Sequence, residues 1–169
     1  MKIGLLGGTF NPPHFGHIGI SKEALDLLNL DEIWWLVTKQ NPLKNSINNN
    51  FEKRVKLCQE ISQNENKILV KDLEKNLKDS YFINLLKKIL TDYQGNEYIL
   101  IIGADNLINF HLWYKWQEIL DLVKIAVFDR GNFLQEAKES KAAIFAKDKI
   151  IFLNNQKYNI SSSKIRNLS

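Results

Sequence analysis

A glycine-rich stretch directly after the first apolar run constrains the fold of this chain more than any other segment. Residues 3–6 read Ile-Gly-Leu-Leu, and the length and position of this run predict a buried first strand. Residues 7–17 then read Gly-Gly-Thr-Phe-Asn-Pro-Pro-His-Phe-Gly-His, and from 18 to 28 apolar residues recur at helical spacing. The pattern predicts a strand, a tight turn and a helix that begins at the turn, which is an arrangement that binds phosphate groups.

Two histidines of this stretch, His14 and His17, are three residues apart. If His17 lies in the first helical turn, both imidazoles can face the region where the free N–H groups of the helix point. Gly7 and Gly8 permit backbone conformations that other residues avoid, and Gly16 has no Cβ to block a close approach. A tight connection with a hydrogen-bonded histidine is the plain alternative. The glycine pair, the proline pair and the His-x-Gly-His ending together favour an anion site.

Apolar runs and helix-like segments alternate along the rest of the chain. Strands are predicted at 33–37, 68–70, 98–102, 124–128 and 150–153, and helices at 51–61, 81–90, 112–122 and 132–146. Ser80 is the expected cap of the helix at 81–90. The alternation predicts an α/β fold, with one doubly wound, Rossmann-like parallel sheet in a single domain over residues 1–169. Ligands bind such sheets where the strand order reverses, so the turns after Leu6 and Ile102 are expected to lie side by side.

Composition narrows the possible functions. The chain has 169 residues, 44% of them hydrophobic, and no apolar run approaches the roughly 18 residues that a membrane span requires. Cys58 is the only cysteine, which excludes an intrachain disulfide and a cysteine-based zinc site. The net charge of +4 comes from scattered lysines, and a phosphate-rich small ligand explains it as well as nucleic acid would. A cytoplasmic location is expected, and the sequence predicts no particular oligomeric state.

A second pattern suited to phosphate lies near the end of the chain. Residues 160–166 read Ile-Ser-Ser-Ser-Lys-Ile-Arg, which predicts a serine-capped helix N-terminus with Arg166 one turn in. Hydroxyl and N–H groups there can bind phosphate oxygens, and the guanidinium can bind them bidentately. A capped terminal helix with a solvated arginine would show the same residues, so this segment alone leaves both interpretations open.

The two patterns together strongly resemble the signatures of the nucleotidyltransferase family that includes nicotinate mononucleotide adenylyltransferases. Those signatures read Gly-Gly-Thr-Phe-(Asp/Asn)-Pro-x-His-x-Gly-His and Ser-Ser-(Thr/Ser)-x-Ile-Arg, and the similarity extends over essentially the whole chain. The resemblance implies transfer of the adenylyl group of ATP to nicotinate mononucleotide, with Mg²⁺ arriving with the nucleotide and no metal site on the protein. It implies no nucleic-acid or membrane partner. Relatives generally continue further, so a short C-terminal helix is expected.

The resemblance also implies roles for residues at matching positions. The residues expected to act in catalysis are His14, His17, Lys44 and Arg166. The residues expected to bind ATP are Gly8, Thr9, Phe10, His14, His17, Gly103, Asp105, Arg130, Ser161, Ser162 and Arg166. The residues expected to bind the acceptor are Lys44, Ser80, Tyr81, Trp113 and Tyr114, with the Trp113 indole on the pyridine ring. Plain alternatives are a solvated Lys44, a helix-capping Asp105, and core packing of Tyr81 and Trp113.

Several positions depart from the family pattern. Leu43 stands where many relatives have histidine, Phe82 where threonine is usual, and Gly131 where proline is common. The nearest alternatives are phosphopantetheine adenylyltransferases, which usually carry threonine at the position of His14 and lack the Ile-Arg ending, and cytidylyltransferases, which share the double histidine. A nucleotide-binding module that no longer catalyses is a third alternative, although both histidines and Arg166 argue against it.

The remaining informative residues are expected to be structural. Trp34, Trp35 and Trp116 are assigned to the core, because large aromatic residues are mostly buried. Cys58 lies in a helix-like segment where packing is the default role. Arg54 is expected either on a helix surface or bracing a loop.

Overall fold

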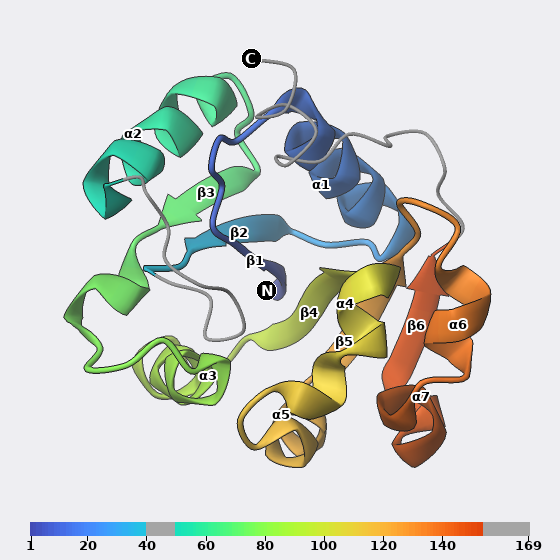
Figure 1. Cartoon of the computed structure of the whole chain (residues 1–169). Coiled ribbons are helices and arrows are strands. Elements are labelled where there is room, and N and C mark those ends of the chain that lie inside the picture. Colours follow the sequence, from blue (N-terminus) through green and yellow to red (C-terminus); the bar gives the residue numbers. More distant parts are fainter. Residues whose placement is uncertain (40–49, 154–169) are drawn as a thin grey trace.

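The computed structural model of the chain describes residues 1–39 and 50–153. Within these residues six strands form one sheet in the order β3-β2-β1-β4-β5-β6, and every neighbouring pair is parallel (Figure 1). The strands are β1 (Lys2–Gly8), β2 (Glu32–Val37), β3 (Ile68–Lys71), β4 (Glu97–Gly103), β5 (Lys124–Phe128) and β6 (Ile150–Leu153). The predicted Rossmann-like α/β fold is therefore confirmed.

Helices cover both faces of the sheet. Figure 1 shows α1 (Phe15–Leu27) and α2 (Phe51–Ser62) on one side of the strands. The opposite side carries α3 (Phe82–Asp92), α4 (Ala104–Ile108), α5 (Trp116–Leu122), α6 (Leu134–Lys138) and α7 (Lys141–Phe145). Three short 3₁₀ helices in the described ranges complete the connections: η1 (Leu73–Asn76), η2 (Phe110–Leu112) and η3 (Lys147–Lys149).

The sheet separates two clusters of buried apolar side chains, one under each layer of helices. Successive residues of β2 alternate between them, so that Trp34 joins the cluster under α3 and Trp35 joins the cluster under α1 and α2. Both indoles are buried, as is Cys58, while Trp116 is partly buried against the first cluster. These four residues pack as predicted. A strand buried on both faces explains why β2 reads as a continuous apolar run.

Two predicted helices differ from the observed ones. The helix predicted from residue 112 begins only at Trp116, because Lys115 has a φ of 52° and interrupts the helical backbone. The helix predicted over 132–146 is two short helices. The break is explained by Ser140, whose Oγ accepts a hydrogen bond from the backbone N–H of Ala143 at 3.3 Å and so caps the start of α7.

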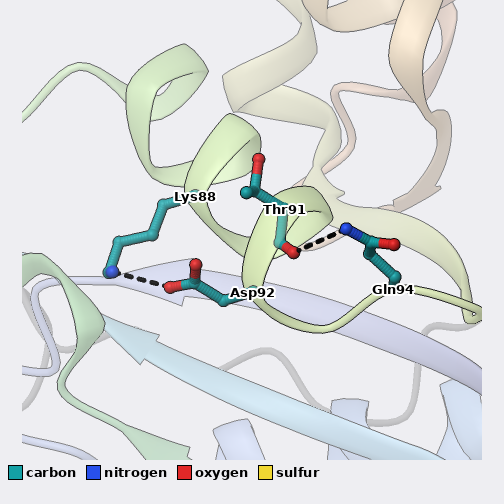
Figure 2. Close-up of polar contacts among 4 residues, drawn as sticks. All are labelled: Lys88, Thr91, Asp92 and Gln94. Atoms are coloured by element: carbon teal, nitrogen blue, oxygen red, sulfur yellow. Dashed lines mark hydrogen bonds and ion pairs between the residues drawn. The ribbon is translucent and has the colours of Figure 1, made fainter.

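The predicted cap of α3 is also wrong. The helix begins after Tyr81, and Asp79 rather than Ser80 accepts a hydrogen bond from the Tyr81 backbone N–H, at 3.1 Å. Figure 2 shows polar contacts at the other end of α3, where Lys88 pairs with the Asp92 carboxylate at 2.7 Å and the Gln94 side chain donates to the Thr91 carbonyl at 3.2 Å. These contacts are solvent-exposed, so they add little to stability.

Candidate active site

The candidate site lies where the strand order reverses. β1 and β4 are neighbours in the sheet, with Leu6 opposite Ile101, although β2, β3 and several helices separate them in sequence. β1 continues to Gly8 and β4 to Gly103, and both strands end at the same edge because they are parallel. The segments that follow Leu6 and Ile102 therefore lie side by side, as expected, although Gly7, Gly8 and Gly103 are the last residues of strands and not turn residues. This is the edge at which open α/β sheets bind ligands.

The loop after β1 is held against the end of β2. The Gly8 carbonyl accepts a hydrogen bond from the backbone N–H of Thr38 at 2.9 Å. Phe10 has a φ of 48°, a left-handed conformation that costs a non-glycine residue about 1–2 kcal/mol. Its ring is buried and stacks on Trp35 with centroids 5.0 Å apart, and this burial offsets the backbone cost. Since the Phe10 side chain is used in packing, the group that remains to contact a nucleotide is its backbone.

His14 and His17 meet at the start of α1. His14 is the N-cap residue and His17 is the third helical residue, so the condition that the sequence analysis set for the two imidazoles is met. The backbone N–H of His14 donates to Nδ1 of His17 at 3.1 Å, and the two imidazole centroids are 3.8 Å apart. The spacing of three residues is what places an N3 side chain over the cap backbone. Because Nδ1 accepts this bond, the neutral His17 ring carries its proton on Nε2.

The hydroxyl of Ser21 links the first turn of α1 to the sheet. The Ser21 hydroxyl donates to the His17 carbonyl at 2.7 Å and accepts from the Trp35 indole N–H at 2.9 Å. Ser21 and Trp35 are both fully buried. The backbone that carries His17 is therefore tied to β2.

Both imidazoles are neutral at pH 7. Burial, followed by the charge of Arg130, lowers the pKa of His14 to about 4. Burial, followed by the charges of His14 and Arg130, lowers the pKa of His17 to about 3. Neither ring nitrogen of His14 has a hydrogen-bond partner among the described residues. A bound anion would provide that partner and would raise both pKa values.

Asp105 and Arg130 come together from the ends of β4 and β5. Nε of Arg130 donates to Oδ1 of Asp105 and Nη2 to Oδ2, both at 3.2 Å. A Cβ on Gly103 would overlap the Asp105 carboxylate and crowd the Arg130 guanidinium, so this close approach requires glycine. Gly131 has a φ of 142°, which is incompatible with the proline that is common at this position in the family.

Three of the residues predicted to bind the acceptor, Tyr81, Trp113 and Tyr114, belong to a group of aromatic rings. Tyr81 and Tyr114 are exposed, and their ring centroids are 4.6 Å apart. Trp113 is partly buried and contacts Phe110 at 4.8 Å and Phe82 at 5.8 Å between centroids. Phe82, which stands in place of the usual threonine, therefore supports the Trp113 ring. Ser80 lies at the start of this group and hydrogen-bonds to the Glu74 carboxylate.

Four predicted site residues, Lys44, Ser161, Ser162 and Arg166, lie outside the described residues. The structure brings the others into two groups. One contains the loop at 8–10, both histidines and the Asp105–Arg130 pair, and the other contains Ser80 and the aromatic rings. Within the described ranges, no three or more His, Cys, Asp or Glu side chains form a group that could hold a metal ion. No helix in the same ranges is long and apolar enough to cross a membrane.

Sequence reasoning missed the environment of Arg54. This residue is buried on the inner face of α2 and donates hydrogen bonds to three loop carbonyls, so the prediction of loop bracing fits and that of a helix surface is wrong. A signal was present, because position 54 falls on the same helical stripe as Phe51 and Cys58. The buried Glu74 gave no such signal, since it belongs to a short 3₁₀ helix.

Comparison with known proteins identifies the family of this chain. A family model described as cytidylyltransferase-like matches residues 5–168. The chain belongs to the cytidylyltransferase-like family. A protein of Pelagibacter ubique named a probable nicotinate-nucleotide adenylyltransferase is 42% identical over 170 residues, covering 99% of this chain and 93% of that protein. A protein of Agrobacterium fabrum with the same name is 37% identical over 185 residues, covering 99% of this chain and 98% of that protein.

A solved structure shares the fold of this chain. The nicotinic acid mononucleotide adenylyltransferase of Plasmodium falciparum, complexed with NaAD, aligns with a TM-score of 0.77 and 21% identity over 98% of this chain and 82% of that chain. At this identity the likeness concerns the fold alone. The resemblance inferred from the two sequence patterns is confirmed by the family match and the two relatives.

Proposed function

We propose that this protein is a nicotinate-nucleotide adenylyltransferase, which transfers the adenylyl group of ATP to nicotinate mononucleotide in NAD biosynthesis. The observation that carries the proposal is the contact between His14 and His17 at the N-terminus of α1, beside the reversal of strand order. The relatives from Pelagibacter ubique and Agrobacterium fabrum, whose names carry this activity, support the choice of acceptor.

The reaction needs no nucleophile from the protein. A phosphate oxygen of nicotinate mononucleotide attacks the α-phosphorus of ATP, and a new P–O bond forms. The bond from the α-phosphorus to the oxygen that bridges to the β-phosphate breaks, and pyrophosphate leaves with the electron pair. Because the second pKa of a phosphate monoester is about 6, the attacking group is largely dianionic at neutral pH and needs no general base. The protein must align two anions and stabilise the charge that develops between them.

We assign His14 and His17 to the α- and β-phosphates. The Nε2–H of a neutral His17 is a hydrogen-bond donor, and the unpartnered ring nitrogens of His14 offer another. Both rings lie at the positive end of the α1 dipole, which favours a bound anion. Neutral imidazoles cost less to bury than imidazolium ions, so the low pKa values keep the site stable until phosphate arrives. These donors would stabilise the transition state as charge moves to the leaving pyrophosphate.

Positive charge is proposed to come from Arg130, which follows β5, and from two residues outside the described ranges. Arg130 is held by Asp105 close enough to the histidines to influence both of their pKa values. In the proposal its guanidinium binds ATP phosphates together with Lys44 and Arg166, whose roles rest on the sequence. The remaining predicted ATP contacts would come from the loop backbone and the serine hydroxyls, at Gly8, Thr9, Phe10, Gly103, Ser161 and Ser162.

Mg²⁺ is proposed to bind with the nucleotide. The described residues offer no carboxylate or histidine cluster for the ion, and Asp105 is already engaged by Arg130. Mg²⁺ prefers phosphate oxygens and retained water to an all-protein cage, so these residues fit an ion held mainly by ATP. When bound, the ion neutralises charge on the phosphate oxygens. A cytoplasmic location stays a prediction.

The acceptor is proposed to bind at the aromatic group. Trp113 is fixed by its contacts with Phe82 and Phe110, so its accessible face can stack on the pyridine ring at a low entropic cost. Tyr81 and Tyr114 stand beside each other as exposed rings and would line the same pocket with Ser80.

A panel of acceptors tests this proposal. Pyrophosphate release would be measured with purified protein, Mg²⁺ and ATP, with nicotinate mononucleotide, nicotinamide mononucleotide or phosphopantetheine in turn. CTP with choline phosphate tests the cytidylyltransferase alternative. We expect the highest kcat/KM with nicotinate mononucleotide, and formation of nicotinate adenine dinucleotide equal to the pyrophosphate released. A preference for phosphopantetheine would support a phosphopantetheine adenylyltransferase, and turnover of CTP with choline phosphate would support a cytidylyltransferase. No turnover with any acceptor would support a non-catalytic module.

A further inference from the structure

Arg54 is a buried cation in a position that the proposed chemistry does not use directly. It lies in the first half of α2, and only 1% of its surface is exposed. Burying a guanidinium is unfavourable unless its N–H groups are bonded and its charge is compensated. The contacts of Arg54 therefore indicate what its burial achieves.

The guanidinium joins the ends of two strands. Nη1 donates to the Thr9 carbonyl at 2.6 Å and to the Thr38 carbonyl at 2.7 Å, and Nη2 donates to the Lys39 carbonyl at 3.1 Å. Thr9 belongs to the loop after β1, and the other two residues directly follow β2. A planar guanidinium fork can bond several carbonyls at fixed angles, which a lysine ammonium on a flexible stem does not reproduce.

The bond to Thr9 controls the geometry of the nucleotide loop. The Thr9 carbonyl and the Phe10 N–H belong to one planar peptide group and point in opposite directions. Fixing the carbonyl therefore fixes the direction of the Phe10 N–H, at a residue whose φ of 48° is unfavourable without support. The Phe10 ring in turn lies 4.8 Å from the His17 ring, between centroids.

The same guanidinium is linked to the acceptor side through Glu74. This carboxylate is buried and accepts a hydrogen bond from the backbone N–H of Lys39 at 3.2 Å. It also bonds Ser80, at the start of the aromatic group. Burial raises the pKa of Glu74, and the nearby charge of Arg54 opposes that rise. Arg54 and Glu74 thus supply opposite charges at the centre of a chain of contacts from Thr9 to Ser80.

We propose that Arg54 is a positioning residue for adenylyl transfer, which orients the phosphate-binding backbone at Thr9 and Phe10 relative to the segment that follows β2. The inference rests on the proposed function of the site. The hydrogen bonds that Arg54 donates within the described residues all go to backbone carbonyls of loop segments, so it would act through the loop that it holds.

The test compares Arg54→Lys and Arg54→Ala with a matched control, Ile89→Ala. Ile89 is fully buried in α3 on the opposite face of the sheet, so its truncation destabilises the protein without disturbing the nucleotide loop. All assays use conditions in which circular dichroism shows each variant to be folded. We expect kcat to fall about 100-fold in both Arg54 variants, because a small displacement of groups that position the substrate costs about that much. In Ile89→Ala, kcat should change less than about threefold.

Chemical rescue separates positioning from general stability. Millimolar guanidinium should restore a saturable part of the kcat of Arg54→Ala, while methylammonium at the same concentration should not, because only the former reproduces the planar donor fork. A folded Arg54→Ala protein with near-wild-type kcat would overturn the inference. Loss of folding in both Arg54 variants, or a loss of kcat that guanidinium leaves unchanged, would assign Arg54 a structural role and would also overturn it.

A binding measurement keeps this inference distinct from the proposed function. If the wild-type protein turned over no nicotinate mononucleotide, the proposed acceptor would be wrong, and Arg54 would be judged on nucleotide binding alone. The affinity for α,β-methylene-ATP, measured by calorimetry, should fall about tenfold in Arg54→Lys and stay unchanged in Ile89→Ala. Equal affinities of wild type and Arg54→Lys in that case would refute the positioning role.

Discussion

The ionisation of His14 predicts a specific loss of stability in acid. His14 is 6% exposed and its pKa is lowered to about 4, whereas an unfolded-state histidine has its ordinary pKa of about 6.5. Below pH 6.5 the unfolded state therefore binds a proton that the folded state does not bind. The free energy of unfolding decreases as the pH is lowered, until the pH reaches the pKa of His14 in the folded protein. At pH 5 these two pKa values correspond to about 2 kcal/mol of lost stability relative to pH 8.

Replacing His14 with glutamine, which does not titrate, isolates this contribution. The free energy of unfolding would be measured by urea titration at pH 8 and at pH 5 for both proteins. The comparison at pH 8 gives the effect of the substitution itself, because His14 is neutral there in both states. Between pH 8 and pH 5 we expect the variant to lose about 2 kcal/mol less than the wild type. An equal loss in both proteins would show that His14 is not held neutral by burial, and the reasoning would fail.

Two further predictions concern the aromatic group and the loop after β5. Trp113→Ala should lower the free energy of unfolding by about 2–3 kcal/mol, because the Trp113 ring packs on Phe82 and Phe110. Tyr114 is exposed, so Tyr114→Ala should change the free energy of unfolding by less than about 1 kcal/mol and raise the KM for nicotinate mononucleotide. Thermal unfolding and initial rates check this difference, and equal effects on stability would contradict it. Gly131→Pro should weaken ATP binding in calorimetry, because a φ of 142° is closed to proline and Arg130 directly precedes it; unchanged affinity would separate this loop from the nucleotide site.

The parts of the fold that were predictable from the sequence rest on local patterns. The continuous apolar run of β2 indicated a strand buried on both faces, and the alternation of such runs with helices indicated a parallel sheet. The spacing of His14 and His17 indicated that both imidazoles could share the start of one helix, and the structure places them there. These features depend on neighbours within a few residues, so a single sequence contains them.

The features that were not predictable depend on distant partners or on single backbone angles. Arg54 bonds the carbonyl of Thr9, which is 45 residues away, and nothing local identifies that contact. The late start of α5 depends on one positive φ angle at Lys115, a residue type that usually favours a helix. The same holds for the candidate site. The histidine pair could be identified from the sequence, whereas the contacts around Glu74 could be identified only from the folded structure.

The catalytic role of His17 is the most direct test of the proposed site. Turnover of ATP and nicotinate mononucleotide by His17→Ala would be compared with wild type, and ATP affinity would be measured separately by calorimetry. Because the donor of His17 is proposed to act on charge that develops in the transition state, kcat should fall about 10²–10³-fold while ATP affinity changes only modestly. Near-wild-type turnover in a folded His17→Ala protein would contradict the proposed mechanism.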